Sequence, residues 1–110
     1  MIETIIRDYL VNAQALPVLF EHQAGLGECY IVEKTGGGET NHIRNATLTI
    51  QSYAATKARA AELNEALIEL MLGAVALADV SAVELNSSYD FTDTVAKAYR
   101  YQAVFDIVHY

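Results

Sequence analysis

Residues 46–53, Ala-Thr-Leu-Thr-Ile-Gln-Ser-Tyr, lead directly into the alanine-rich stretch 54–71, and this join decides the fold. In the first stretch Ala46, Leu48 and Ile50 alternate with polar residues, which is typical of a strand with one buried face. In the second stretch the apolar period lengthens to about 3.6 residues, which predicts an amphipathic helix. The predicted buried face of this helix consists of Ala60, Leu63, Leu67, Leu70, Met71 and Ala74.

The same criteria divide the rest of the chain into elements. A helix is predicted from Ile2 to about Ala15, because Pro17 disfavours helical backbone at the residue before it. The central helix is predicted to stop at Gly73. The predicted strands lie at residues 18–20, 29–33, 46–51, 83–91 and 99–107. The order α-β-β-β-α-β-β predicts one α+β domain, residues 1–110. It should be a two-layer sandwich in which two helices cover one face of a mainly antiparallel sheet of about five strands.

A glycine triplet marks the connection between the second and third strands. The residues of this connection are Lys34, Thr35, Gly36, Gly37, Gly38, Glu39, Thr40 and Asn41. Three consecutive glycines predict a flexible hairpin tip, and we expect it to become ordered on meeting an assembly partner. A phosphate-binding loop needs its lysine after the glycines and a helix directly behind them. Here the lysine comes first and a strand follows, so the hairpin interpretation is preferred.

The charge balance and the cysteine content exclude several classes of function. Fourteen Asp and Glu against seven Lys and Arg give a net charge of -7. The sequence therefore lacks the basic surface that grips nucleic-acid phosphates or anionic membranes. The longest apolar run, residues 70–78, is too short to span a bilayer. Cys29 has no second cysteine for an intrachain disulfide or a cysteine-based zinc site. We expect Cys29 to be a small apolar residue in a strand, with a reactive thiol as the alternative, and the protein to be soluble and made in a reducing cytoplasm.

No residue pattern predicts catalysis, a metal site or a bound cofactor. His22, His42 and His109 lie far apart in the sequence. No serine has the sequence context of a nucleophile elbow, and the sequence identifies no neighbouring base for Cys29. Glu39 and His42 have a Glu-x-x-His spacing, but di-metal bundles use this spacing in pairs on facing helices. Here it occurs once, in a predicted loop. We therefore predict that the protein is not an enzyme.

Tyrosine is the one compositional oddity, with seven tyrosines and no tryptophan. Four of the seven, Tyr89, Tyr99, Tyr101 and Tyr110, fall in or directly after the last two predicted strands. Tyrosines at the edge of the core are the ordinary explanation, and a subunit interface, where tyrosine is enriched, is the alternative. The predicted interface residues are Tyr99, Tyr101, Val104 and Val108, with the two valines on the otherwise polar face of the last strand.

Four stretches in order carry a resemblance to a known family. Tyr30–Lys34 enters the glycine-rich hairpin, and 46–53 passes straight into the helix 54–71. A strand ending Ser-Tyr-Asp-Phe-Thr-Asp at 88–93 precedes the closing run Tyr-Arg-Tyr-Gln-Ala-Val-Phe-Asp-Ile at 99–107. This order covers nearly the whole chain and resembles the small tail terminator, or tail completion, proteins of long-tailed bacteriophages.

The resemblance implies a structural role in the virion. Such proteins form rings, commonly hexameric, that cap a finished tail tube, stop its polymerisation and present a surface to the head connector. The implied partners are further copies of the chain, the tail tube protein and the head-connector protein. The implied location is the head–tail junction of the virion, after assembly in the host cytoplasm. The role requires no catalytic residue and no cofactor, and it involves no membrane.

This role would give a function to a row of acidic residues on the central predicted helix. Glu62, Glu65 and Glu69 recur at i, i+3 and i+7, a pattern more typical of a solvated face than of a metal site. DNA would pass through the ring without being specifically bound, and acids facing the lumen would repel its phosphates. We therefore predict that these glutamates, with the acids of the hairpin, line the lumen. Their reversal to lysine should slow DNA ejection and leave assembly intact.

Two alternative functions remain open at the level of sequence. The first is another head–tail adaptor or a tube-forming subunit, which would have a similar size and sheet. The second belongs to a different class: a small dimeric α+β domain that binds a ligand or catalyses a reaction in a pocket between helix and sheet.

Overall fold

The computed structural model describes all residues from Met1 to Tyr110. A five-stranded sheet forms the centre of the fold. Its strands are β1 (Val18–Leu19), β2 (Cys29–Thr40), β3 (Ile43–Ala54), β4 (Val80–Asp90) and β5 (Tyr99–His109). The spatial order is β1-β2-β3-β5-β4. Strand β1 pairs in parallel with β2, and every other neighbouring pair is antiparallel. The predicted α+β class and the mainly antiparallel sheet are confirmed.

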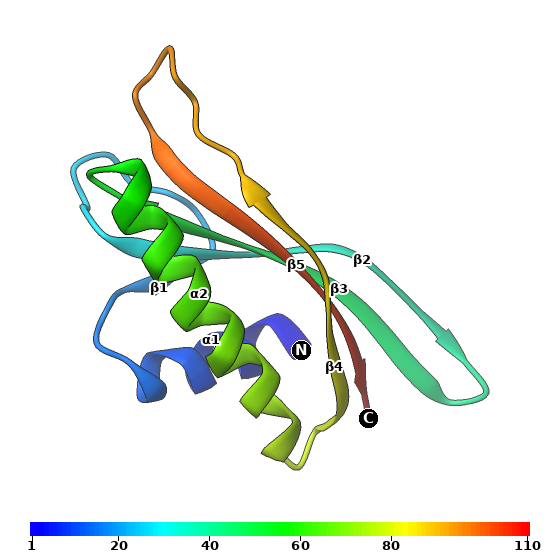
Figure 1. Ribbon diagram of the computed structural model, residues 1–110. Coiled ribbons are helices and arrows are strands. Elements are labelled where there is room, and N and C mark those ends of the chain that lie inside the picture. The colour runs from blue at the N-terminus through cyan, green and yellow to red at the C-terminus, as the bar shows by residue number, and fades with distance from the viewer.

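Two helices cover one face of this sheet (Figure 1). They are α1 (Ile2–Ala13) and α2 (Lys57–Gly73), and a short 3-10 turn, η1 (Ala74–Ala76), follows α2. Helix α2 begins three residues later than its apolar pattern, because β3 stays paired with β5 as far as Ala54. Thr56 then caps the helix, its hydroxyl accepting a hydrogen bond from the Arg59 backbone N–H at 3.2 Å. Neither helix is long and apolar enough to cross a membrane.

The core lies between the helices and the sheet. The predicted buried face of α2 is correct apart from Leu70, which is only half-buried. From the sheet, β3 contributes Leu48 and Ile50 and β5 contributes Phe105, all of them fully buried. Tyr9 ties the helices together, since its hydroxyl donates to the Leu70 carbonyl at 2.7 Å. The apolar layer therefore fixes both helices on the same face of the sheet.

The predicted glycine tip is wrong, because the three glycines belong to β2. Gly36, Gly37 and Gly38 pair with residues 47, 46 and 45 of β3, and the two strands stay paired out to their ends. The turn consists of Asn41 and His42 alone, with φ of 52° and 67°. Two consecutive residues with positive φ match the two-residue turn that suits the twist of a hairpin. Because glycine has no side chain, residues 36–38 show no alternation of polar and apolar residues. The sequence pattern therefore gives no sign that they belong to a strand.

The sheet extends beyond the helices at both ends. Figure 1 shows the β2–β3 hairpin and the β4–β5 hairpin projecting from opposite ends of the helical layer. The molecule is accordingly elongated, with extents of 45 × 25 × 21 Å. The helix-free face of the sheet, which we call the bare face, carries the side chains that alternate with the core residues.

Candidate functional site

The sequence candidates for chemistry are scattered in the structure. His22 lies in the loop before β2 and stacks on Tyr53, with ring centroids 4.2 Å apart. His42 lies in the β2–β3 turn, and His109 ends β5. No three His, Cys, Asp or Glu side chains are grouped so that they could hold a metal ion. The histidines therefore do not form a common site.

The predicted interface residues do not form one surface. Tyr99 and Tyr101 pair with Ala54 and Ser52 and so share the helix-covered face, whereas Val104 and Val108 lie on the bare face. All four side chains are half-buried. Their separation follows from the period of 2 along β5, because odd and even residues point to opposite sides of the sheet. Any interface would therefore use the tyrosines or the valines, but not both on one face.

The bare face carries a chain of hydrogen-bonded polar side chains across three strands. The Arg100 guanidinium donates to the Tyr53 hydroxyl at 2.9 Å, and that hydroxyl donates to Gln51 Oε1 at 3.1 Å. The Gln51 amide donates to Gln102 Oε1 at 2.9 Å, and the Gln102 amide donates to the Tyr89 hydroxyl. These five side chains therefore satisfy part of one another's hydrogen-bonding capacity.

One end of the bare face carries a small apolar cluster that the sequence patterns did not predict. Cys29, Ile31 and Tyr53 are buried there, and Leu26 from the loop and Ala98 from the β4–β5 turn pack against them. Burial raises the pKa of the Cys29 thiol above its ordinary value. Cys29 is therefore a small apolar residue in a strand, as predicted.

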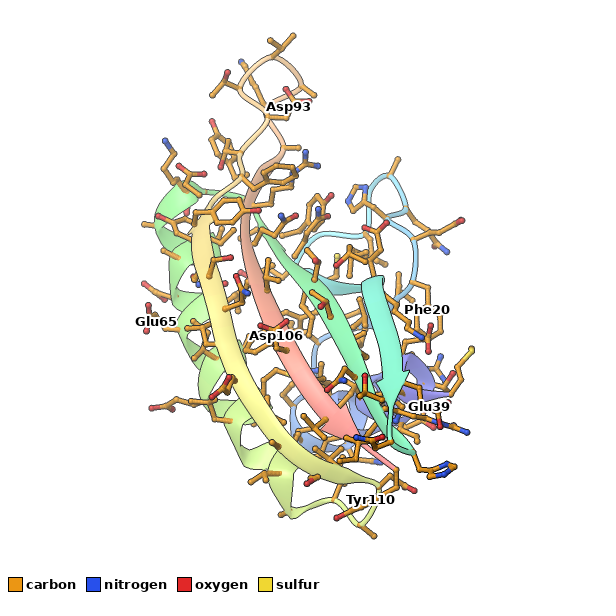
Figure 2. All side chains as sticks on the ribbon, turned by 90° about the vertical axis from the view of Figure 1, so that its right-hand side faces the viewer. Phe20, Glu39, Glu65, Asp93, Asp106 and Tyr110 are labelled. Carbon is orange, nitrogen blue, oxygen red and sulfur yellow. The ribbon has the colours of Figure 1, made fainter.

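The two side edges of the sheet are the largest unpartnered backbone surfaces. Strand β4 has a neighbour on one side only, β5. Strand β1 covers only Tyr30 and Ile31 of β2, so β2 has no strand beside it from Val32 to Thr40. The edges lie on opposite sides of the molecule, as Figure 2 shows by the positions of β4 and of Glu39 on β2. Unpaired edges of this length are templates for pairing with another chain.

Hydrogen bonds at the strand ends show which N–H groups face outward. The Tyr30 N–H donates to the Pro17 carbonyl on the β1 side at 2.9 Å. By alternation, and with the register shift after Lys34, the N–H of Glu39 also faces the open side of β2. On β4 the Phe91 N–H donates to the Arg100 carbonyl of β5 at 2.9 Å, and the register then directs the N–H of Leu85 away from β5.

Bulges divide both edges into shorter regular segments. The register shifts between Lys34 and Gly36 on β2, and between Val80 and Ala82 and between Leu85 and Ser87 on β4. Bulges bend an edge strand, interrupt its row of hydrogen-bonding groups and so work against pairing along its whole length. Regular pairing along these edges is therefore limited to the segments between the register shifts.

Ion pairs hold the loop before β2 against α2. The Arg59 guanidinium contacts Glu28 at 2.7 Å and Glu62 at 3.1 Å. The hydrogen bond from Arg59, more than its charge, holds the pKa of Glu28 below its ordinary value. Of the predicted lumen residues, Glu62 is therefore already paired within its own chain. Glu65 and Glu69 are exposed and form no ion pair.

Comparison of the chain with protein-family models and with curated proteins gave no match.

Proposed function

We propose that this protein is a structural subunit that closes into a ring and caps the tail tube of a long-tailed bacteriophage. It would terminate tube polymerisation and present a surface to the head connector, as the resemblance to tail terminator proteins implies. Its partners would be further copies of itself, the tube protein and the connector protein, with DNA passing through the ring unbound.

The two unpaired edges of one sheet carry this proposal. Along the order β2-β3-β5-β4 each strand is antiparallel to the next, so β2 and β4 run in opposite directions. When β4 of one copy lies beside β2 of the next, the new pair is antiparallel and continues the alternation. A contact between two different surfaces of the same chain is heterologous, and repetition about a rotation axis closes it into a ring.

The charge of the bare face also favours a structural role. Its three acids, Glu33, Glu84 and Asp106, outnumber the single cation Arg100, which donates a hydrogen bond to Tyr53. Such a surface has little attraction for a nucleic acid that slides past it.

Proline substitution on the open edges tests the ring. Leu85→Pro removes an N–H that has no partner within the chain, so the monomer should fold, because edge strands accept proline where the N–H faces solvent. The variant should not assemble, since β4 loses a donor to the next copy. Leu85→Ala is the matched control, because it removes the same side chain and keeps the N–H. Glu39→Pro should block the β2 edge in the same way.

The readout is the mass in solution by light scattering, together with recruitment to purified tail tubes seen by electron microscopy. We expect the wild type and Leu85→Ala to form a ring, alone or at one end of a tube. Both proline variants should remain folded monomers and leave the tube ends bare. Rings of unchanged mass from both proline variants would overturn edge-to-edge assembly. A wild type that neither forms a ring nor binds tube ends would overturn the proposed function.

A further inference from the structure

The largest cavity of the molecule lies at the base of the β2–β3 hairpin, on the helix-covered side. It has a volume of about 550 Å³ and is bounded by the first turn of α1 and by β2, β3 and the end of β5. The basic and titratable nitrogen groups on its wall are Lys34, Arg44 and His109, and the acids are Glu3 and Glu39. Three adjacent strands therefore bring together basic side chains in a chain that is otherwise strongly acidic.

The two cations of this cavity have no partner within the chain. Neither Lys34 nor Arg44 forms an ion pair within 4.0 Å or a side-chain hydrogen bond. By contrast, Arg7, Lys57 and Arg59 each contact a carboxylate. The cavity thus holds two positive charges that form no ion pair within the chain, beside two acids, Glu3 and Glu39, that form none either.

Gly37 leaves the space in which the charged side chain of Lys34 lies. A Cβ atom on Gly37 would lie 3.0 Å from Lys34 Cε and 3.5 Å from its ammonium nitrogen. The lysine side chain therefore lies across the glycine, in space that any other residue would fill. This gives Gly37 a role in the position of the Lys34 ammonium group.

A complementary acidic surface lies on the opposite side of the same chain. Glu65 and Glu69 are exposed on α2 and have no ion pair. Figure 2 shows Glu65 on the β4 side of the molecule and Glu39, on the cavity wall, on the β2 side. Edge-to-edge joining of β4 to β2 would bring α2 of one copy next to the cavity of its neighbour.

The two surfaces also match in height along the strands. The Asn64 amide donates to the Ser88 hydroxyl at 2.7 Å, and Ser88 lies in the row of the sheet that ends at Val32 of β2. Five helical residues further on, at about 1.5 Å each, Glu69 lies about two strand residues lower. That is the row of Lys34. Copies related by a ring axis stay at one height, so these side chains would face each other.

We infer that this cavity receives the carboxylates of Glu65 and Glu69 from the adjacent copy in the ring. The inference rests on the proposed ring, and it gives the edge-to-edge contact a second, ionic component that fixes its direction. It also assigns Glu65 and Glu69 to the contact between copies, and not to the lumen. The two assignments predict different results for the same substitution.

A charge swap tests the contact. Lys34→Glu and Glu69→Lys should each weaken association on the order of tenfold, because each replaces an attraction with a like-charge contact. The double variant Lys34→Glu/Glu69→Lys should recover wild-type association, since it restores opposite charges in the reversed sense. The matched controls are Lys97→Glu and Glu21→Lys, exposed residues that carry the same charge changes outside both surfaces.

Association is measured as mass against concentration, or as occupancy of tube ends, at about 0.05 M and about 0.5 M salt. Circular dichroism confirms that each variant is folded. We expect the controls to behave as wild type and the effect of each single reversal to shrink at high salt. A ring that forms equally well from both single variants would overturn the ionic contact and leave the ring intact. Weakened single variants without recovery in the double variant would also overturn it. A wild type that never forms a ring would overturn the proposed function first.

Discussion

Gly37 offers the sharpest test of the ordered β2–β3 hairpin. In the structure a Cβ at Gly37 would lie 2.9 Å from the backbone oxygen of Asn45, whereas a Cβ at Gly38 would meet nothing within 4 Å. Neither glycine has positive φ, so alanine fits the backbone at both. Gly38→Ala should therefore stabilise the protein by about 0.4–1 kcal/mol, because alanine lowers the entropy of the unfolded chain.

Gly37→Ala gains the same entropy term but forces a strand carbonyl to move. Overpacking of this kind costs about 1–3 kcal/mol, so the two variants should differ by roughly that amount. For a domain of this size 1 kcal/mol corresponds to about 4 °C in Tm, which predicts a difference of about 4–12 °C in thermal unfolding. If the hairpin were the flexible tip that its glycines suggest, these residues would keep their freedom in the folded state, and neither variant would change the stability. Equal Tm values for the two would refute the paired hairpin.

Three further predictions follow from burial and charge. Leu67 is fully buried, so Leu67→Ala should lower the free energy of unfolding by about 2–5 kcal/mol, whereas the half-exposed Leu72→Ala should change it by less than about 0.5 kcal/mol in urea titrations. Burial of Cys29 and its raised pKa should make its reaction with a thiol reagent at least about a hundredfold slower in the native protein than in urea, and equal rates would contradict the buried cluster. The lowered pKa of Glu28 contributes stability above the pKa of the unfolded chain and loses it as the pH falls. Glu28→Gln should therefore lower Tm at neutral pH and have less effect near about pH 3, and an equal effect at both would contradict the pairing with Arg59.

The fold class could be predicted because its determinants are local. Alternation along 46–51 and the change of period after Ala54 each depend on residues close in sequence, and both elements form as expected. Strand β4 begins at Val80, ahead of the predicted start at Val83, because the register shift between Val80 and Ala82 interrupts the alternation. The second half of β2 could not be predicted for a related reason. Its glycines have no side chains, so polar and apolar residues do not alternate there.

The candidate site could not be predicted in the same way, because it depends on which strands become neighbours. The order β2-β3-β5-β4 leaves two open edges, and no local pattern specifies this order. Likewise Lys34, Arg44 and His109 line one cavity only in the folded sheet: Arg44 pairs with His109 across β3 and β5, and the Lys34 side chain lies against Gly37 of β2. The placement of Tyr99 and Tyr101 on one face of the last strand, and of Val104 and Val108 on the other, follows from the strand period alone and agrees with the register.

The mass of the wild-type protein in solution is the decisive test of a closed ring. Light scattering after size exclusion, over a concentration series at low and moderate salt, distinguishes a closed ring from other assemblies. A ring of six copies should give a species near six times 12.1 kDa that does not grow further with concentration. A tight dimer at every concentration would contradict it, because pairing of identical edges would then have replaced the head-to-tail joining of β4 to β2.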